Sequence, residues 1–274
     1  MAIKNKTIQN ISKDSDKRLL NEIWDRLQKI DTIRALDINN ISIHVDDGEV
    51  LLLGHLVSDG HKQRIEKEIS KIQGVISIKN QLISDRELIS KVARALAKDS
   101  RTHKLILYVG AFHGWVHING KVPLEKDRDL VEEVAASVPE VRGVVDLPKL
   151  VSGQKADKHH IIQPEIDNRV YDRTNSIGRV YRVIINPHNR LVIGVVVEAD
   201  LPVNGHNEIG YFVVSSDFMK VVNEGGIILE NSLPDLTSSP LFNQVEFIAP
   251  PEDWSPPYPY VSGEILWPKG ISDV

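Results

Sequence analysis

The sequence predicts an α+β protein in which two α-β-β-α-β modules precede a small all-β barrel and an irregular tail rich in proline and aromatic residues. Two observations support this: an internal repeat in the first half of the chain, and a series of short strand-like segments after a polar linker. A length of 274 residues suits two or three domains. We expect a flexible N-terminus at 1–16, modules at 17–83 and 84–150, a linker at 151–163, a barrel at 164–238 and a docking tail at 239–274.

Composition excludes several classes of function. The chain has no cysteine, which excludes disulfide scaffolds, Cys-ligated zinc, iron–sulfur clusters and thiol nucleophiles. A formal net charge of −5 argues against nucleic-acid binding, and we expect no nucleic-acid partner. The N-terminus lacks the apolar run of a signal peptide, and no apolar stretch reaches membrane-spanning length. We therefore expect a cytoplasmic protein.

The repeat is visible in the spacing of its glycines. Two pairs lie 66 residues apart and a third lies 69 apart, so a three-residue insertion follows the second pair. The pairs are Gly48 with Gly114, Gly54 with Gly120, and Gly74 with Gly143.

Each copy begins with a predicted helix and continues into a hairpin. Leu19, Ile23 and Leu27 recur at helical spacing, as do Leu88 and Val92 in the second copy. Asp47-Gly48 and His113-Gly114 suit two-residue primed turns, which require positive φ. A second apolar stripe then follows in each copy, formed by Ile65, Ile69 and Ile72 and by Leu130, Val134 and Val138, before a short strand that begins at Gly74 or Gly143.

This pattern of D-G, L-x-G, a charged helix, G-V and a closing strand resembles the BON domain, named for osmotic-stress and nodulation proteins. The first copy matches more closely, because the second has His113 where the aspartate would stand. The motif consists of turn glycines and core positions and contains no catalytic group. The resemblance implies association with phospholipid surfaces or a role in envelope stress.

Short strands separated by turn signals follow the linker and indicate a small barrel. The segments V-x-D-x-x-x-x-I-G-x-V at 170–180, V-V-S-S-D-F at 213–218 and G-I-I-L at 226–229 are similar to the PRC-barrel. That family is known from the photosynthetic reaction-centre H subunit and a ribosome-maturation factor. The resemblance implies docking to a protein assembly.

The tail combines six prolines with a concentration of aromatic residues. Proline disfavours regular secondary structure, whereas disordered tails are poor in aromatic residues. We therefore expect the tail to dock on its own barrel or on a neighbouring subunit. The candidate docking residues are Phe242, Phe247, Trp254, Tyr258, Tyr260 and Trp267.

The second hairpin offers a candidate interaction surface. Strand alternation directs Val109, Ala111, Val116 and Ile118 to the helix-covered face. The opposite face then carries Tyr108, Phe112, Trp115 and His117. These residues suit a membrane interface or a partner surface, and the alternative is that they pack against another module.

We expect no metal, no cofactor and no catalytic site. His113 and His117 lie on either side of a turn, and the pair His159-His160 lies in the linker without carboxylates at ligand spacing. Motifs of α/β-hydrolases, P-loops, dinucleotide-binding folds and zinc proteases are absent from the sequence.

The sequence therefore predicts a non-enzymatic scaffold or adaptor that attaches to a phospholipid membrane surface or a protein assembly, with peripheral binding to the inner membrane face and self-association as a homo-oligomer. The alternative is a small-ligand or ion sensor, because some BON-containing proteins are associated with potassium binding.

Overall fold

A computed structural model describes residues 2–152, 162–172, 176–203, 206–223, 226–229 and 241–270, with side chains described outside 2–13, 201–208 and 220–223. The chain forms two compact units. The first contains Met1–Arg94 with Tyr108–Val116, and the second contains Ala95–Leu107 with His117–Val274. The tip of the second hairpin thus belongs to the same unit as the first repeat.

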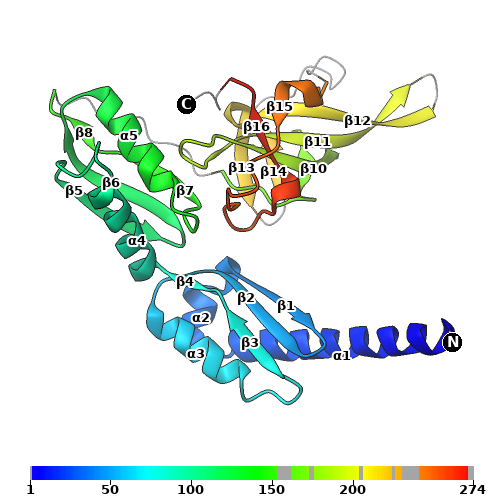
Figure 1. Cartoon of the computed structure of the whole chain (residues 1–274). Helices are drawn as coiled ribbons and strands as arrows, with labels where there is room; N and C mark the ends of the chain where they lie inside the picture. The colour runs from blue at the N-terminus through cyan, green and yellow to red at the C-terminus, as the bar shows by residue number, and fades with distance from the viewer. Residues whose placement is uncertain are drawn as a thin grey trace. The chain divides into compact units, whose positions relative to one another are not determined.

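The first repeat forms a small sheet with helices (Figure 1). The strand order is β1-β2-β3, with β1 antiparallel and β3 parallel to β2, and β4 also pairing β2. Its elements are α1 (Ala2–Gln28), α2 (Asp31–Leu36), η1 (Ile38–Asn40), β1 (Ile41–Asp46), β2 (Glu49–Leu56), α3 (Asp59–Ile69), β3 (Ser77–Asn80) and β4 (Ile83–Ser84).

Helix α1 is longer than the sequence predicts. It begins at Ala2 and so runs through residues 2–16, where we expected a flexible N-terminus. This segment contains neither glycine nor proline, so nothing in it interrupts helical hydrogen bonding. Only the part from Leu19 onward contributes to the core, through Leu19, Ile23 and Leu27.

The first hairpin follows the predicted register. Asp47 and Gly48 have φ of 45° and 81°, as a primed turn requires, and Val45 pairs with Val50 across the hairpin. Strand alternation places Ile43 and Leu52 in the core beneath the helices.

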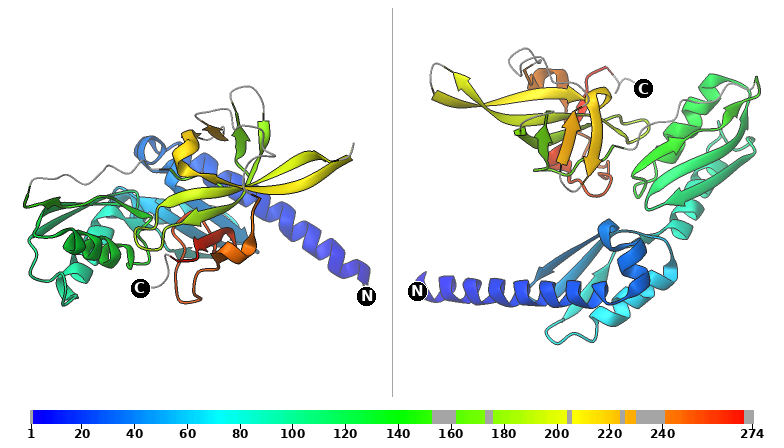
Figure 2. Two further views of the ribbon diagram at one scale, coloured as in Figure 1. Left: turned by 90° about the horizontal axis from the view of Figure 1, so that it is seen from above. Right: turned by 180° about the vertical axis from the view of Figure 1, so that it is seen from behind.

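The second repeat has the same element order with one additional short strand, and Figure 2 shows its helices from two further directions. The strand order is β5-β6-β7, and β8 pairs β6. Its elements are α4 (Asp85–Lys98), β5 (Leu107–Phe112), β6 (Trp115–Val122), α5 (Glu125–Ala136), β7 (Gly143–Asp146) and β8 (Lys149–Leu150). On α5, Val131 is fully buried and Leu130 only partly, so the apolar stripe is shifted by one residue from our expectation.

The C-terminal region is built on a sheet with the order β12-β11-β10-β9-β14-β13. Its elements are β9 (Arg169–Tyr171), β10 (Ser176–Ile185), β11 (Val192–Val203), β12 (His206–Ser215), η2 (Ser216–Phe218), β13 (Met219–Asn223), β14 (Gly226–Leu229), η4 (Gln244–Glu246), β15 (Phe247–Ile248), η5 (Ser262–Glu264) and β16 (Ile265–Pro268). Among the described residues, the end strands β12 and β13 are not neighbours in this order. The PRC-barrel therefore stays a prediction.

The tail contributes a regular strand, which the proline content did not lead us to expect. Strand β16 runs parallel to β10, with Val183 opposite Ile265, and it also pairs with β15. Strand β10 is therefore flanked on one side by β11 and on the other by β9 and then β16.

Gly54 provides a test of the repeat's structural motif. Its φ is 118°, and a Cβ added there would collide with the backbone carbonyl of Asn40. We expect Gly54→Ala to lower the free energy of unfolding by about 2–4 kcal/mol, measured by urea denaturation. Gly263→Ala is the matched control, because no atom lies within 4 Å of the added Cβ. Equal stabilities of the two variants would contradict the assignment.

Candidate interaction site

The four residues predicted on the open sheet face do not form one open patch. Tyr108 and Phe112 are 69% and 54% exposed, as that prediction requires, but Trp115 is only 9% exposed. His117 is half-buried, and its Nδ1 lies 2.7 Å from a carboxylate oxygen of Asp146. The exposed aromatic surface is therefore limited to Tyr108 and Phe112 on β5, which we call the β5 surface.

The tail aromatic residues lie against the C-terminal sheet of their own chain. Trp267 and Tyr260 are buried in its core, with Trp254 packed at the margin. The Tyr260 hydroxyl donates to the carbonyl of Pro164 at 2.6 Å. Phe242 and Phe247 pack on a second apolar cluster of the same sheet, and Tyr258 is half-buried.

Arg190 connects the tail to α5. Its Nη1 donates to the carbonyls of Ala136 and Val138 at 3.1 and 2.9 Å, and its Nη2 donates to the carbonyl of Ser255. The guanidinium carbon also lies 4.6 Å from the ring centre of Trp254. A cation suits this position because the last carbonyls of a helix carry partial negative charge.

Burial lowers the pKa of Arg190 to about 10, with Glu140 opposing the shift. Burial likewise lowers the pKa of Arg142, again to about 10, and its guanidinium lies 5.3 Å from the ring centre of Tyr258. Both side chains remain cations at neutral pH. They place two buried positive charges where α5, β7 and the tail meet.

The two hairpin turns are held by equivalent carboxylates. Asp16 accepts hydrogen bonds from the amides of Asp47 and Gly48 at 3.0 and 3.2 Å. In the second repeat, Asp85 accepts the amide of His113 at 2.7 Å. Asp16 and Asp85 are 69 residues apart, the same offset that relates their helices. An aspartate at the helix start thus fixes the turn in both copies.

The side chain of His113 makes a further contact that the first repeat has no equivalent for within its own module. Its Nε2 lies 3.0 Å from Oδ1 of Asp37, at the end of α2 in the first repeat. Asp37 is fully buried and also accepts the amide of Val57 at 2.8 Å and Nδ1 of His61 at 2.5 Å. The substitution of histidine for aspartate at this turn therefore ties it to the first module.

The two buried carboxylates respond to this environment in opposite directions. Burial alone would raise the pKa of Asp37, but hydrogen bonds from His113, Val57 and His61 outweigh it and lower the pKa below 3.8. Burial raises the pKa of Asp85, although the amide and charge of His113 partly offset it. Asp37 is thus ionised when it receives His113.

Some features in the described part of the chain bear on other functions. Within it, no group of three or more His, Asp and Glu residues is arranged to hold a metal ion. No described helix combines the length and hydropathy needed to cross a membrane. His159 and His160 lie outside the described residues.

The sequence did not reveal Asp37 or Arg190 as important. Asp37 lies outside the glycine pattern, and Arg190 occupies a turn at a φ of 63°. The equal offset of Asp16 and Asp85 was the available signal for the turn carboxylates, and the departure of His113 from the first copy was the signal for the inter-repeat contact.

The fold defines a tandem-repeat α+β protein with a C-terminal sheet. The BON domain family matches residues 15–83 and 84–150, so the first half of the chain consists of two tandem BON domains. No curated protein matches the chain.

Two solved structures of CdsD, a structural protein of the type III secretion system of Chlamydia trachomatis, are similar at 15% identity, with TM-scores of 0.31 and 0.30. Each similarity covers 38% of this chain, and 48% and 50% of the CdsD chains, the second of which is its C-terminal domain. This chain thus matches about half the length of those structures, and similarity at this level supports no conclusion about function.

Replacing Arg190 tests its role in holding the tail. We expect Arg190→Met to lower the free energy of unfolding by about 2–4 kcal/mol, because buried carbonyls lose their donor. Limited proteolysis should also cleave faster within 251–260. Arg182→Met is the control, because Arg182 contacts mainly the ring of Tyr181 and should cost about 1 kcal/mol or less. Equal effects would contradict the role of Arg190.

The pKa of Asp37 predicts an acid-dependent stability. Because this pKa is lowered on folding, ionised Asp37 stabilises the protein above pH 3.8, and the contribution is lost as pH falls through the lower folded value. We expect wild type to be more stable than Asp37→Asn at pH 7, with the difference shrinking below about pH 4. Asp85 is common to both proteins and cancels. Urea unfolding from pH 7 to 3 measures this, and a pH-independent difference would refute it.

Proposed function

We propose that this protein is a non-enzymatic scaffold or adaptor that attaches peripherally to a phospholipid surface through its second BON domain and associates with itself or with a larger protein assembly. The family of the two N-terminal domains supports this proposal, because BON domains are associated with phospholipid binding and envelope stress. A location at the inner face of the membrane follows from the same proposal.

The β5 surface is the observation that carries the lipid-binding part. Tyr108 and Phe112 are exposed on the same side of β5, which is an edge strand. Aromatic residues suit a membrane interface, where one side of the ring contacts acyl chains and the other contacts water. Trp115, by contrast, lies in the interior and has no part in this surface.

The C-terminal region serves in this proposal as a docking module, with domains at 17–83, 84–150 and 164–238 and the tail at 239–274. The resemblance of residues 164–236 to the PRC-barrel supports it. The tail already packs on its own sheet through Tyr260 and Trp267. Its aromatic residues are therefore assigned to stabilising this module, and the partner of the module binds elsewhere on it.

Vesicle flotation tests the lipid-binding proposal. We expect wild type to float with vesicles containing anionic phospholipid, and Tyr108→Ala/Phe112→Ala to lose most of the floating fraction, because the aromatic area that enters the interface is removed. Phe218→Ala is the matched control, since it removes an exposed aromatic ring from η2 in the C-terminal region.

Circular dichroism must show that both variants remain folded. Flotation of the double variant at the wild-type level, or no flotation of wild type with either anionic or neutral vesicles, would refute membrane attachment through the β5 surface.

A further inference from the structure

The contact between His113 and the first BON domain has a counterpart elsewhere in the sequence of the chain. A spacing of 66 residues relates the two hairpins, and it also relates the starts of α3 and α5. Applied to the three residues of the contact, it leads from Asp37 to His103, from His61 to Asp127, and from His113 back to Asp47.

The charges at these equivalent positions are reversed. In the observed contact a turn histidine, His113, meets a carboxylate, Asp37, which is flanked by His61. At the equivalent positions the turn residue is a carboxylate, Asp47, and the receiving residues are His103 and Asp127. An aspartate facing a histidine thus recurs with the two partners exchanged. The second BON domain therefore carries the polar complement of the first domain's turn.

The surroundings of the first turn extend its negative charge. Asp46, Asp47 and Glu49 are all exposed and follow one another around Gly48. The carboxylate of Asp16, which holds the turn amides, adds to the same charge. The equivalent positions around Gly114 carry no carboxylate.

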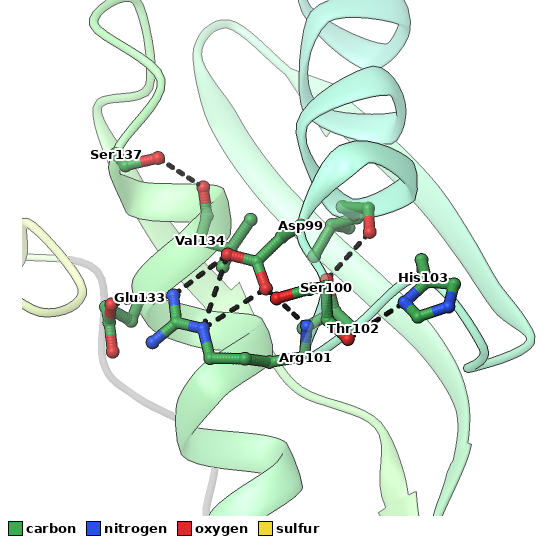
Figure 3. A network of polar contacts seen from close by, with 9 residues as sticks. Asp99, Ser100, Arg101, Thr102, His103, Glu133, Val134 and Ser137 are labelled. Carbon is green, nitrogen blue, oxygen red and sulfur yellow. Dashed lines mark hydrogen bonds and ion pairs between the residues drawn. The ribbon is translucent and has the colours of Figure 1, made fainter.

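The surroundings of His103 are positive. Lys98, Arg101 and Lys104 are exposed within the loop that follows α4, where Asp99 is the one acidic residue. Figure 3 shows this loop beside α5, with Arg101 bonded to Asp99 and Glu133 at 2.9 and 3.1 Å.

These bonds give the loop a fixed shape. Thr102 is buried and donates to the carbonyl of Leu96 at 2.7 Å, and Nδ1 of His103 lies 2.9 Å from the carbonyl of Ser100. His103 itself is exposed. A rigid positive loop is a better receptor than a mobile one, because less conformational entropy is lost on binding.

We propose that the Asp47 turn of one copy of this protein docks on the His103 loop of a second copy, with the pairing of aspartate and histidine that His113 and Asp37 show within one chain. The partner is thus a second molecule of the same chain, recognised by opposite charge on two rigid turns. This inference rests on the self-association contained in the proposed function and gives it a surface.

The contact is heterologous, because a different surface is used on each of the two copies. Each molecule carries one Asp47 turn and one His103 loop, so the assembly extends head to tail into a chain or closes into a ring. Because exposed charges hold it, rising salt concentration weakens it.

Sedimentation velocity of the full chain tests the proposal through charge exchange. Asp47→His keeps the turn foldable, because the chain already builds the same primed turn from His113-Gly114 with φ of 47° and 87°. His103→Asp reverses the receptor. We expect wild type to form concentration-dependent oligomers that dissociate with salt, and each variant alone to associate at least tenfold more weakly.

Mixing the two variants supplies the decisive comparison. The new His at position 47 meets the new Asp at position 103, and the native pair forms in the other direction, so we expect the mixture to recover wild-type association. Asp253→His, at an exposed tail position, is the matched control and should associate like wild type.

The outcomes separate this surface from the wider function. Oligomers of wild type that persist in both variants would refute the Asp47–His103 contact while leaving self-association intact. A monomeric wild type at low salt and at its solubility limit would refute both. Vesicle flotation is measured separately and does not depend on either result.

Discussion

The two-residue hairpin turn is the constraint on which both BON domains depend. Each turn requires two successive residues at positive φ, and its amides point away from the sheet. A carboxylate from the first helix of the same domain accepts these amides, Asp16 in one copy and Asp85 in the other. Because the helix also supplies core residues such as Ile23, the turn, the helix and the sheet are fixed together.

One substitution within this shared plan gives the second hairpin an additional role. Asp and His both tolerate the turn conformation, so the hairpin folds with either. Histidine, however, reaches Asp37 and buries itself, whereas Asp47 stays at the surface. The two repeats thus share a backbone plan but differ in what their turns can bind.

The C-terminal unit uses a buried cation for a related purpose. Arg190 satisfies carbonyls at the end of α5 and in the tail, and the ring of Trp254 covers it. A buried charge is costly unless hydrogen bonds surround it. The tail must therefore pack in a defined position, which explains why a segment rich in proline nevertheless contributes strand β16 to the sheet.

Periodicity and turn chemistry were sufficient to predict the repeat and most of its core. Val50, Leu52, Ile65 and Ile69 are buried as their spacing indicates, because one face of each element must leave water. Tyr108 and Trp115 were placed on the same open face by strand alternation, yet only Tyr108 is exposed. Alternation identifies the face of a sheet but not what covers it.

The polar contacts could not be predicted for a related reason. Asp37 and His113 are 76 residues apart, and Arg190 meets a helix end more than 50 residues earlier. Such pairs depend on tertiary position and leave no local pattern. The departure of His113 from the first copy marked the position as unusual without revealing its partner.

A double-mutant cycle between Asp37 and His113 tests the central claim, that the second hairpin is bonded to the first BON domain. Urea unfolding of wild type, Asp37→Asn, His113→Asn and the double variant gives the coupling free energy. We expect about 1–3 kcal/mol, because both partners are buried and the hydrogen bond involves a charged carboxylate. Effects that add to within about 0.3 kcal/mol would show that the two residues act independently and would contradict the account.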